Sequence, residues 1–499
     1  MMGKNLIKGL FICCLMALVL EASLSEAADP LRQGMQSYKS HHYEDAAATL
    51  LAHLRSANPG QQGKLYLGLG MTFLACAQVY QELHQTALSV QVDYLSKLLA
   101  SHKEDGSHYA KLYLGLSLLD SGKPAEAAVL LRTCIGDKKI EPRDKSLAKI
   151  ALARAYYLQG KNKNADELWS SVDTSDPEVV SELAATYSRL GLAERKPLAM
   201  EDQIRQMMQQ SQKGDSIRLI NNLITVYARE GQIDKGLRLL KGSDLSDFFY
   251  EETMGKNKVV RFYDSSLLEN LAVLYGRASL KFLGKAATDE KVKGVAQYYL
   301  AEAEAQFGHI DQSIKILDDV LASGLLPPPY REKAELLQGV ARSWQSGGGQ
   351  SQMVLENSIW QQNEPHVLAD TLLVCNRLNL ECAEIARKAT TLVEAIDGKK
   401  LETLPYALGR YYLRAHEYDQ AIACMEMVRD KSNKNKIEYN DPLMLINLAE
   451  AYYRSKRFSE ALEIYFGMRN QFPAVRQIQI SMQGVYAMEQ KSAGDAKLF

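Results

Sequence analysis

The chain has 499 residues, which is more than one globular core usually holds and favours several domains or a solenoid. It carries 59 basic and 60 acidic residues, a net charge of −1, and this balance argues against a general nucleic-acid binder, because such proteins usually have a basic excess. Only 13 prolines occur and runs of alternating β-branched residues are scarce, so we expect an all-α chain.

Residues 1–27 have the pattern of a secretory signal peptide. Two lysines precede the apolar run Leu10–Leu20, and the small residues Ser25 and Ala27 fit the rule for cleavage after Ala27. An uncleaved anchor helix is the alternative, although the run is short for crossing a bilayer. We therefore expect an exported protein, periplasmic or secreted, with no membrane span after cleavage.

The remaining chain shows pairs of amphipathic helices, in which apolar residues recur at three- and four-residue steps. The clearest pairs are Tyr113–Leu131, Leu152–Pro177, Leu223–Leu240, Leu300–Pro329, Tyr406–Val428 and Met444–Pro473. Small residues in the middle of the apolar faces let two helices approach closely. The predicted packing residues are Gly115, Ala127, Ala153, Ala165, Ala301, Gly409, Ala421, Ala449 and Ala461.

Breaks in this pattern suggest the domain organisation. We expect N-terminal repeats at 28–240, an insertion or long loop at 241–263, degenerate repeats at 264–400, C-terminal repeats at 401–473, and a capping helix and tail at 474–499. Within the N-terminal repeats, the segment Leu65–Ala100 is helical and roughly repeat-length, but its pattern is degenerate. The last helix would cover the exposed core at the end of the stack.

The segment Met444–Pro473 resembles a tetratricopeptide repeat, a helix–turn–helix unit of about 34 residues. Ala449, Tyr452, Phe458 and Ala461 stand where the family favours those residue types. The resemblance implies a right-handed superhelical solenoid of about ten to eleven hairpins. Together with the predicted signal peptide, the resemblance implies a tetratricopeptide repeat protein of the exported bacterial type.

In this family the first helix of each repeat lines the concave surface, and arginines recur at two of its positions. The candidate partner-binding residues are Arg154, Arg189, Arg229, Arg277, Arg410, Arg414 and Arg454. They could form a cationic ladder for a carboxylate-bearing partner, since arginine pairs bidentately with carboxylates. Alternatively, they are solvated residues that favour the helix dipole near each helix end.

No HExxH, paired CxxC or phosphate-loop motif occurs, so we predict no catalytic residue, no metal and no cofactor. Five cysteines remain after cleavage, and buried packing is the simplest role for them. Cys375 and Cys382 are the only close pair. On one continuous helix they would lie too far apart to bond, whereas a turn near Asn379 would let them face each other.

The resemblance implies a non-catalytic scaffold or adaptor of the cell envelope that binds a protein partner along a concave groove. One alternative is a glycan-binding accessory factor of polysaccharide export, which would use the arginines on an anionic glycan. Another is a cell-wall lytic enzyme with a helical superhelix. The chain lacks the Glu-Ser pair that opens the catalytic lobe of those enzymes.

Overall fold

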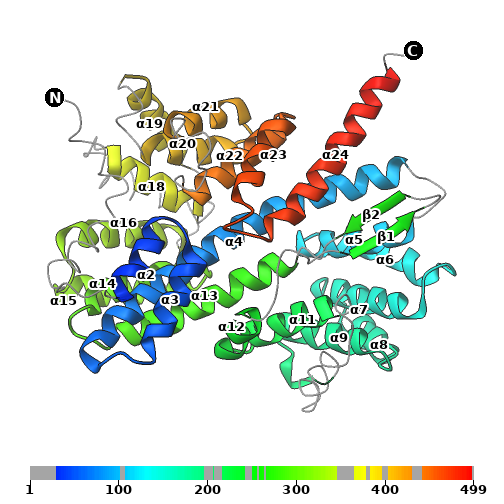
Figure 1. The fold of residues 1–499 in the computed structure, drawn as a ribbon, viewed down its shortest axis with the longest axis horizontal. Coiled ribbons are helices and arrows are strands. Elements are labelled where there is room, and N and C mark those ends of the chain that lie inside the picture. Colours follow the sequence, from blue (N-terminus) through cyan, green and yellow to red (C-terminus); the bar gives the residue numbers. More distant parts are fainter. Residues whose placement is uncertain are drawn as a thin grey trace. The chain divides into compact units, whose positions relative to one another are not determined.

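The computed structural model describes most of the chain from residue 30 onward (Figure 1). The described residues are 30–101, 107–195, 206, 216–241, 250–254, 258–262, 266–345, 365–377, 382–395, 403–429 and 441–496. The predicted signal peptide lies outside them. In the described part, none of the helices combines the length and the apolarity that crossing a bilayer requires.

The chain divides into two compact units, each built from separate stretches of sequence. Unit 1 comprises Met1–Val79 and Ala278–Gly467, and unit 2 comprises Tyr80–Arg277 and Met468–Phe499. These boundaries cut across the ranges expected from sequence, since the last helix belongs to the same unit as residues 80–277.

Unit 1 is a set of helices packed against their neighbours in chain order. Its helices are α2 (Pro30–Lys39), α3 (Tyr43–Leu54), α14 (Lys293–Gln306), α15 (Ile310–Ser323), α16 (Pro328–Gln345), α18 (Pro365–Arg377), α19 (Ala383–Ala395), α20 (Thr403–Arg414), α21 (Tyr418–Val428), α22 (Pro442–Arg454) and α23 (Phe458–Met468), the last of which ends one residue into unit 2. Figure 1 shows α18 to α23, in yellow to orange, as successive neighbours.

Unit 2 has the same organisation. Its helices are α5 (Ser107–Asp120), α6 (Pro124–Gly136), α7 (Pro142–Leu158), α8 (Asn162–Ser170), α9 (Pro177–Arg189), the 3₁₀ turn η1 (Ala193–Arg195), α11 (Ser216–Arg229), α12 (Ile233–Lys241) and α24 (Val475–Ala496). Two long helices, α4 (Pro59–Ser101) and α13 (Ser266–Ala286), contribute residues to both units.

Among the described helices, eight pairs share one turn. In each pair three residues separate the first helix from the next element, as between Asp120 of α5 and Pro124 of α6. The middle residue always has a positive φ, between 61° and 81°. These residues are His41, Gly122, Gly160, Gly191, Gly231, Gly308, His416 and Lys456. The backbone N–H that follows the middle residue donates to the carbonyl five residues earlier, at 2.8–2.9 Å, which is the Schellman bond that closes a helix end.

Small residues lie where the two helices of a hairpin meet. The seven predicted packing alanines are fully buried, at 0% exposure. The two glycines also mark close approaches. A Cβ added to Gly115 would lie 2.9 Å from the Leu131 side chain, and one on Gly409 would lie 2.7 Å from Met425. Alanine would therefore crowd these positions, although it suits the others.

The segment expected at Leu65–Ala100 as a degenerate repeat is one uninterrupted helix, α4, of 43 residues. No proline and no glycine occurs in it after Gly70, so nothing in the sequence ends the helix early. In unit 1, Gly70 lets α13 approach closely, since a Cβ there would lie 2.5 Å from Leu283. Ser279 Oγ donates to the Gly70 carbonyl at 2.8 Å and fixes this contact.

The range expected as an insertion, 241–263, contains the one β-hairpin of the described residues. Strands β1 (Tyr250–Met254) and β2 (Lys258–Phe262) pair antiparallel, with Tyr250 opposite Phe262 and Met254 opposite Lys258. Apart from this hairpin, the described chain is helical, so the predicted all-α fold of stacked hairpins is confirmed.

Cys375 and Cys382 form a disulfide, with their Cα atoms 6.6 Å apart. The bond is possible because α18 ends at Arg377 and α19 begins at Ala383, so Cys375 and Cys382 do not share one helix. The alternative of one continuous helix is thus wrong, while the expected turn near Asn379 lies outside the described residues. Cys76, Cys134 and Cys424 are buried free thiols, as expected for packing residues.

Candidate functional site

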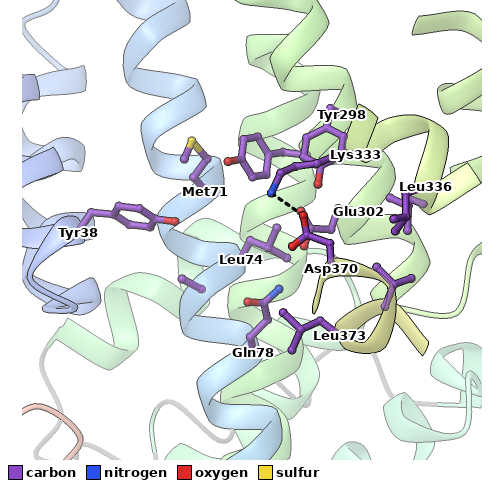
Figure 2. Close-up of a pocket in the computed structure, with 14 residues that line it drawn as sticks. Tyr38, Met71, Leu74, Gln78, Tyr298, Glu302, Lys333, Leu336, Asp370 and Leu373 are labelled. Carbon is purple, nitrogen blue, oxygen red and sulfur yellow. Dashed lines mark ion pairs between the residues drawn. The ribbon is translucent and has the colours of Figure 1, made fainter. Parts of the chain in front are cut away.

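A pocket in unit 1 is lined by side chains from five helices (Figure 2). Tyr38 comes from α2, and the other lining residues come from α4, α14, α16 and α18. Within each of these four helices the lining residues recur at three- or four-residue steps, as with Leu74 and Gln78, so each helix turns one face toward the pocket. The pocket has a volume of about 190 Å³.

Much of the lining is apolar. Met71, Leu74, Leu336, Leu373 and Val374 contribute aliphatic or thioether surface. This surface comes from α4 and from α16 and α18, which follow much later in the sequence. An apolar pocket with a few polar groups is the usual form of a binding site in a protein.

The polar part of the lining is an ion pair and a third charged residue. Lys333 Nζ lies 3.3 Å from Asp370 Oδ2, and both side chains remain partly exposed, at 17% and 23%. Glu302 of α14 lines the same pocket. Gln78 also reaches the lining, and its amide donates to Gln306 Oε1 at 3.2 Å.

Tyrosine rings hold one wall of the pocket in place. Tyr298 and Tyr299 meet edge to face with centroids 5.1 Å apart, and each also contacts Tyr330, at 5.7 and 6.0 Å. Tyr38 contacts Tyr43 at 5.5 Å. Because these rings pack on one another, the wall is a preformed surface and not a set of mobile side chains.

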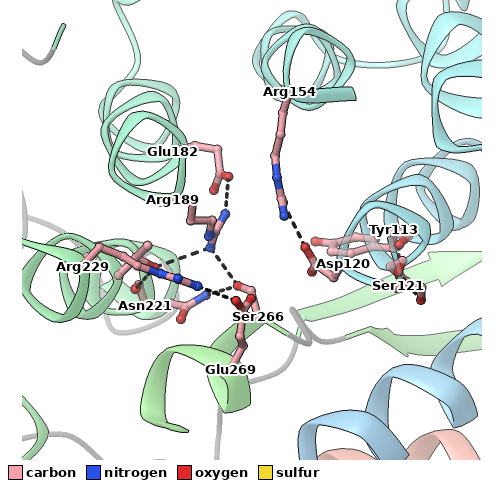
Figure 3. A network of polar contacts seen from close by, with 12 residues as sticks. Tyr113, Asp120, Ser121, Arg154, Glu182, Arg189, Asn221, Arg229, Ser266 and Glu269 are labelled. Carbon is pink, nitrogen blue, oxygen red and sulfur yellow. Dashed lines mark hydrogen bonds and ion pairs between the residues drawn. The ribbon is translucent and has the colours of Figure 1, made fainter. Parts of the chain in front are cut away.

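Unit 2 carries a network of ion pairs and hydrogen bonds, shown in Figure 3. Its members lie on α5, α7, α9, α11 and α13. Arg154 of α7 pairs with Asp120 of α5 at 2.9 Å. Arg189 of α9 pairs with Glu182 at 3.4 Å and donates to Ser266 Oγ at 3.0 Å. These groups are largely buried, with Arg189 only 6% exposed. Charges inside a protein are stable only when paired in this way.

The network extends through α11 and α13. Arg229 pairs with Glu269, and Asn221 donates to Ser266 Oγ at 3.0 Å. Asn270 in turn donates to Asn221 Oδ1 at 2.8 Å. Burial raises the pKa of Glu269, but Arg229, with His84 and two further arginines, outweighs burial and holds that pKa below its ordinary value. Glu269 is therefore a carboxylate in the folded protein.

The seven arginines predicted as partner contacts fall into both units. Arg154, Arg189 and Arg229 are members of the network in unit 2. Arg277, also in unit 2, is exposed. The sequence indicated their spacing, but not that three of them have acidic partners within the same unit.

The other three predicted arginines, Arg410, Arg414 and Arg454, lie in unit 1. Arg414 Nη1 donates to the carbonyl of Cys375 at 3.4 Å and to that of Asn376 at 3.3 Å, at the end of α18. Burial lowers the pKa of Arg414, and the neighbouring Arg410 lowers it further. Arg454 is 33% exposed and lies 3.6 Å from Glu450. Arg414 is thus tied to the helix that carries the disulfide.

Comparison with known proteins finds a repeat family that matches one segment of the chain. Residues 406–466, which span most of α20 to α23, match the family model of the tetratricopeptide repeat. No curated protein matches the chain. The crystal structure of yeast Tom70 aligns over 93% of this chain and 96% of its own, with 11% identity and a TM-score of 0.31. That of the APC/C hetero-tetramer Cut9–Hcn1 aligns over 96% and 99%, with 13% identity and a TM-score of 0.25. At these TM-scores the structural alignments support no further inference.

Proposed function

Because this chain carries tetratricopeptide repeats, we propose that it is a non-catalytic scaffold or adaptor that binds a protein partner through unit 1. The family fold is consistent with a protein-interaction scaffold. In this proposal the partner lies along the face formed by α4, α14, α16 and α18, and the pocket described above anchors it.

The pocket is the observation that carries this proposal. Residues from five helices enclose it, so no single hairpin could form it, and its tyrosine wall is held in place by ring contacts. A rigid site with an apolar floor reduces the entropy that a partner loses on binding. An extended or helical segment of a partner would place one side chain in the pocket.

The arginine contacts remain part of the proposal, with unequal support. In unit 2, an acidic partner would have to displace Glu182 from a buried ion pair with Arg189, which is costly. Arg414 is an exposed residue and the Arg454 side chain is 33% exposed, and a carboxylate on the partner could approach them without breaking a buried ion pair. We therefore place the acidic contacts of the partner on unit 1.

We also propose that the protein is exported, to the periplasm if the cell has two membranes. The signal-peptide pattern of residues 1–27 supports this location. The disulfide between Cys375 and Cys382 supports it independently, because disulfides persist in oxidising compartments and are rare in the cytosol.

Crosslinking in intact cells followed by affinity purification from the envelope tests the function. Ala75 lines the pocket and is half-buried, so Ala75→Trp should fill the cavity without disturbing a hairpin core. We expect the variant to lose the crosslinked partner. Met427→Trp, on an exposed position of α21 in the same unit, is the matched control and should retain it.

Equal capture by both variants would place the partner elsewhere and contradict the proposal. Recovery of an anionic glycan in place of a protein, with binding that weakens as salt rises, would contradict it as well.

A further inference from the structure

The charge on the pocket wall is unbalanced. Two carboxylates, Glu302 and Asp370, line the cavity together with one ammonium group, that of Lys333. Lys333 lies 3.3 Å from Asp370, and this pair bridges α16 and α18. The lining therefore holds one more carboxyl group than ammonium group, beside a largely apolar surface.

We propose that this pocket receives a lysine or arginine side chain from a protein partner. The inference rests on the proposed function and adds the chemistry that the partner must present. The cation lies at Glu302 and Asp370, and the methylene stem of the same side chain covers the apolar floor.

Charge complementarity favours a cation over an anion. A carboxylate in the pocket would gain Lys333 but would compete with Asp370 for it and would face Glu302 as a like charge. A cation meets two carboxylates and one like charge. Because the lining is partly withdrawn from water, these charge interactions are stronger than at an exposed surface.

The apolar floor selects a long side chain over a small cation. Leu373 and Val374 are half-buried and offer surface against which methylene groups can pack, whereas a hydrated ion gains nothing from it. The tyrosine wall adds aromatic surface, which also attracts cations. Lysine and arginine are the two natural side chains that combine a methylene stem with a permanent positive charge.

A random peptide library displayed on phage, selected against the purified full-length protein, tests the proposal even while the partner is unidentified. We expect the enriched peptides to share a lysine or arginine beside an apolar residue. A synthetic peptide of the enriched sequence should bind in solution, as measured by fluorescence anisotropy. Replacing its basic residue by glutamine should raise the dissociation constant about tenfold, as expected for the loss of a charge-assisted contact.

Glu302→Gln is the matching change on the protein, since it removes the charge and keeps the shape. This variant should bind the peptide more weakly by a similar factor. When the variant is tested with the glutamine peptide, the affinity should fall little further. Glu335→Gln is the control, because Glu335 is exposed, pairs with Arg331 and lies outside the pocket lining. It should leave the affinity unchanged.

Enrichment of acidic peptides, no enrichment at all, or equal binding by Glu302→Gln and wild type would overturn the inference. These outcomes differ from failure of the proposed function. If Ala75→Trp still abolishes partner capture in cells, the scaffold function stands and only the cationic anchor is wrong. If Ala75→Trp has no effect there, the proposed site itself is wrong.

Discussion

The two units build different surfaces from the same hairpin. In unit 1, the helices that line the pocket leave a cavity with aliphatic and tyrosine walls, and its Lys333–Asp370 pair remains partly exposed. In unit 2, Arg154 and Arg189 pair with Asp120 and Glu182, and all four side chains are at most 13% exposed. A recurring arginine in a repeat protein can therefore stabilise the packing of one unit, while the other unit retains a partly exposed pocket.

Breaking the network in unit 2 should have the largest effect. Arg189→Met removes a buried guanidinium and leaves Glu182, which is 11% exposed, without its cation. We expect the free energy of unfolding of unit 2 to fall by about 3–5 kcal/mol, as for other broken buried pairs. Trp169 is buried in unit 2, and its fluorescence during urea unfolding can report this change once Trp344 and Trp360 are replaced by phenylalanine.

The control for this prediction is Arg387→Met in unit 1. Arg387 pairs with Glu384, but both side chains are exposed, at 73% and 43%. An exposed pair of this kind contributes less than about 1 kcal/mol. If the two variants lost similar stability, the distinction between a buried network and a surface pair would fail.

Unit 1 should respond instead to reduction of its disulfide. The bond between Cys375 and Cys382 closes a short loop, with a sequence separation of 7. The loop-entropy relation gives a stabilisation of about 2–3 kcal/mol for a loop of this length. We expect a reductant to lower the melting temperature and to raise amide hydrogen exchange in α18 and α19. The double variant Cys375→Ala with Cys382→Ala should show the same exchange, and a reductant should no longer change it.

Acid should weaken unit 2 through Glu269, by a smaller amount. Its pKa is below its ordinary value of 4.5 in the folded protein, so its contribution to stability is complete above pH 4.5 and is lost as pH falls through the folded pKa. We expect the free energy of unfolding to fall over this range by less than it does in Arg189→Met. Urea unfolding at pH 5.5 and at lower pH measures it, and Glu269→Gln should show a shallower dependence. An equal dependence in both proteins would assign the acid sensitivity to other carboxylates.

The hairpins could be predicted from sequence because their signals are local. Ala449 and Ala461 lie within one short stretch, and their spacing alone indicated the contact that buries them. The long helix α4 was interpreted as a degenerate repeat because its length matched one, although the absence of a helix breaker after Gly70 pointed to a single helix.

The pocket and the network could not be predicted in this way because their members are distant in sequence. Lys333 and Asp370 are separated by 37 positions and belong to different helices. Arg189 donates to Ser266, 77 residues later. The position of a residue within its repeat indicates whether it lies on the first helix of a hairpin. Which side chains it contacts depends on how neighbouring hairpins pack against each other.

The constancy of the three-residue turn has a consequence for where this chain can accept foreign sequence. Eight turns close with the same bond, from the residue after a left-handed position such as Gly160 or Lys456, so an extra residue there would misalign the paired helices. The connections from a second helix to the next first helix vary, and one of them holds the β-hairpin Tyr250–Phe262. A fluorescent domain or an epitope is therefore best grafted into those connections, for example between α6 and α7.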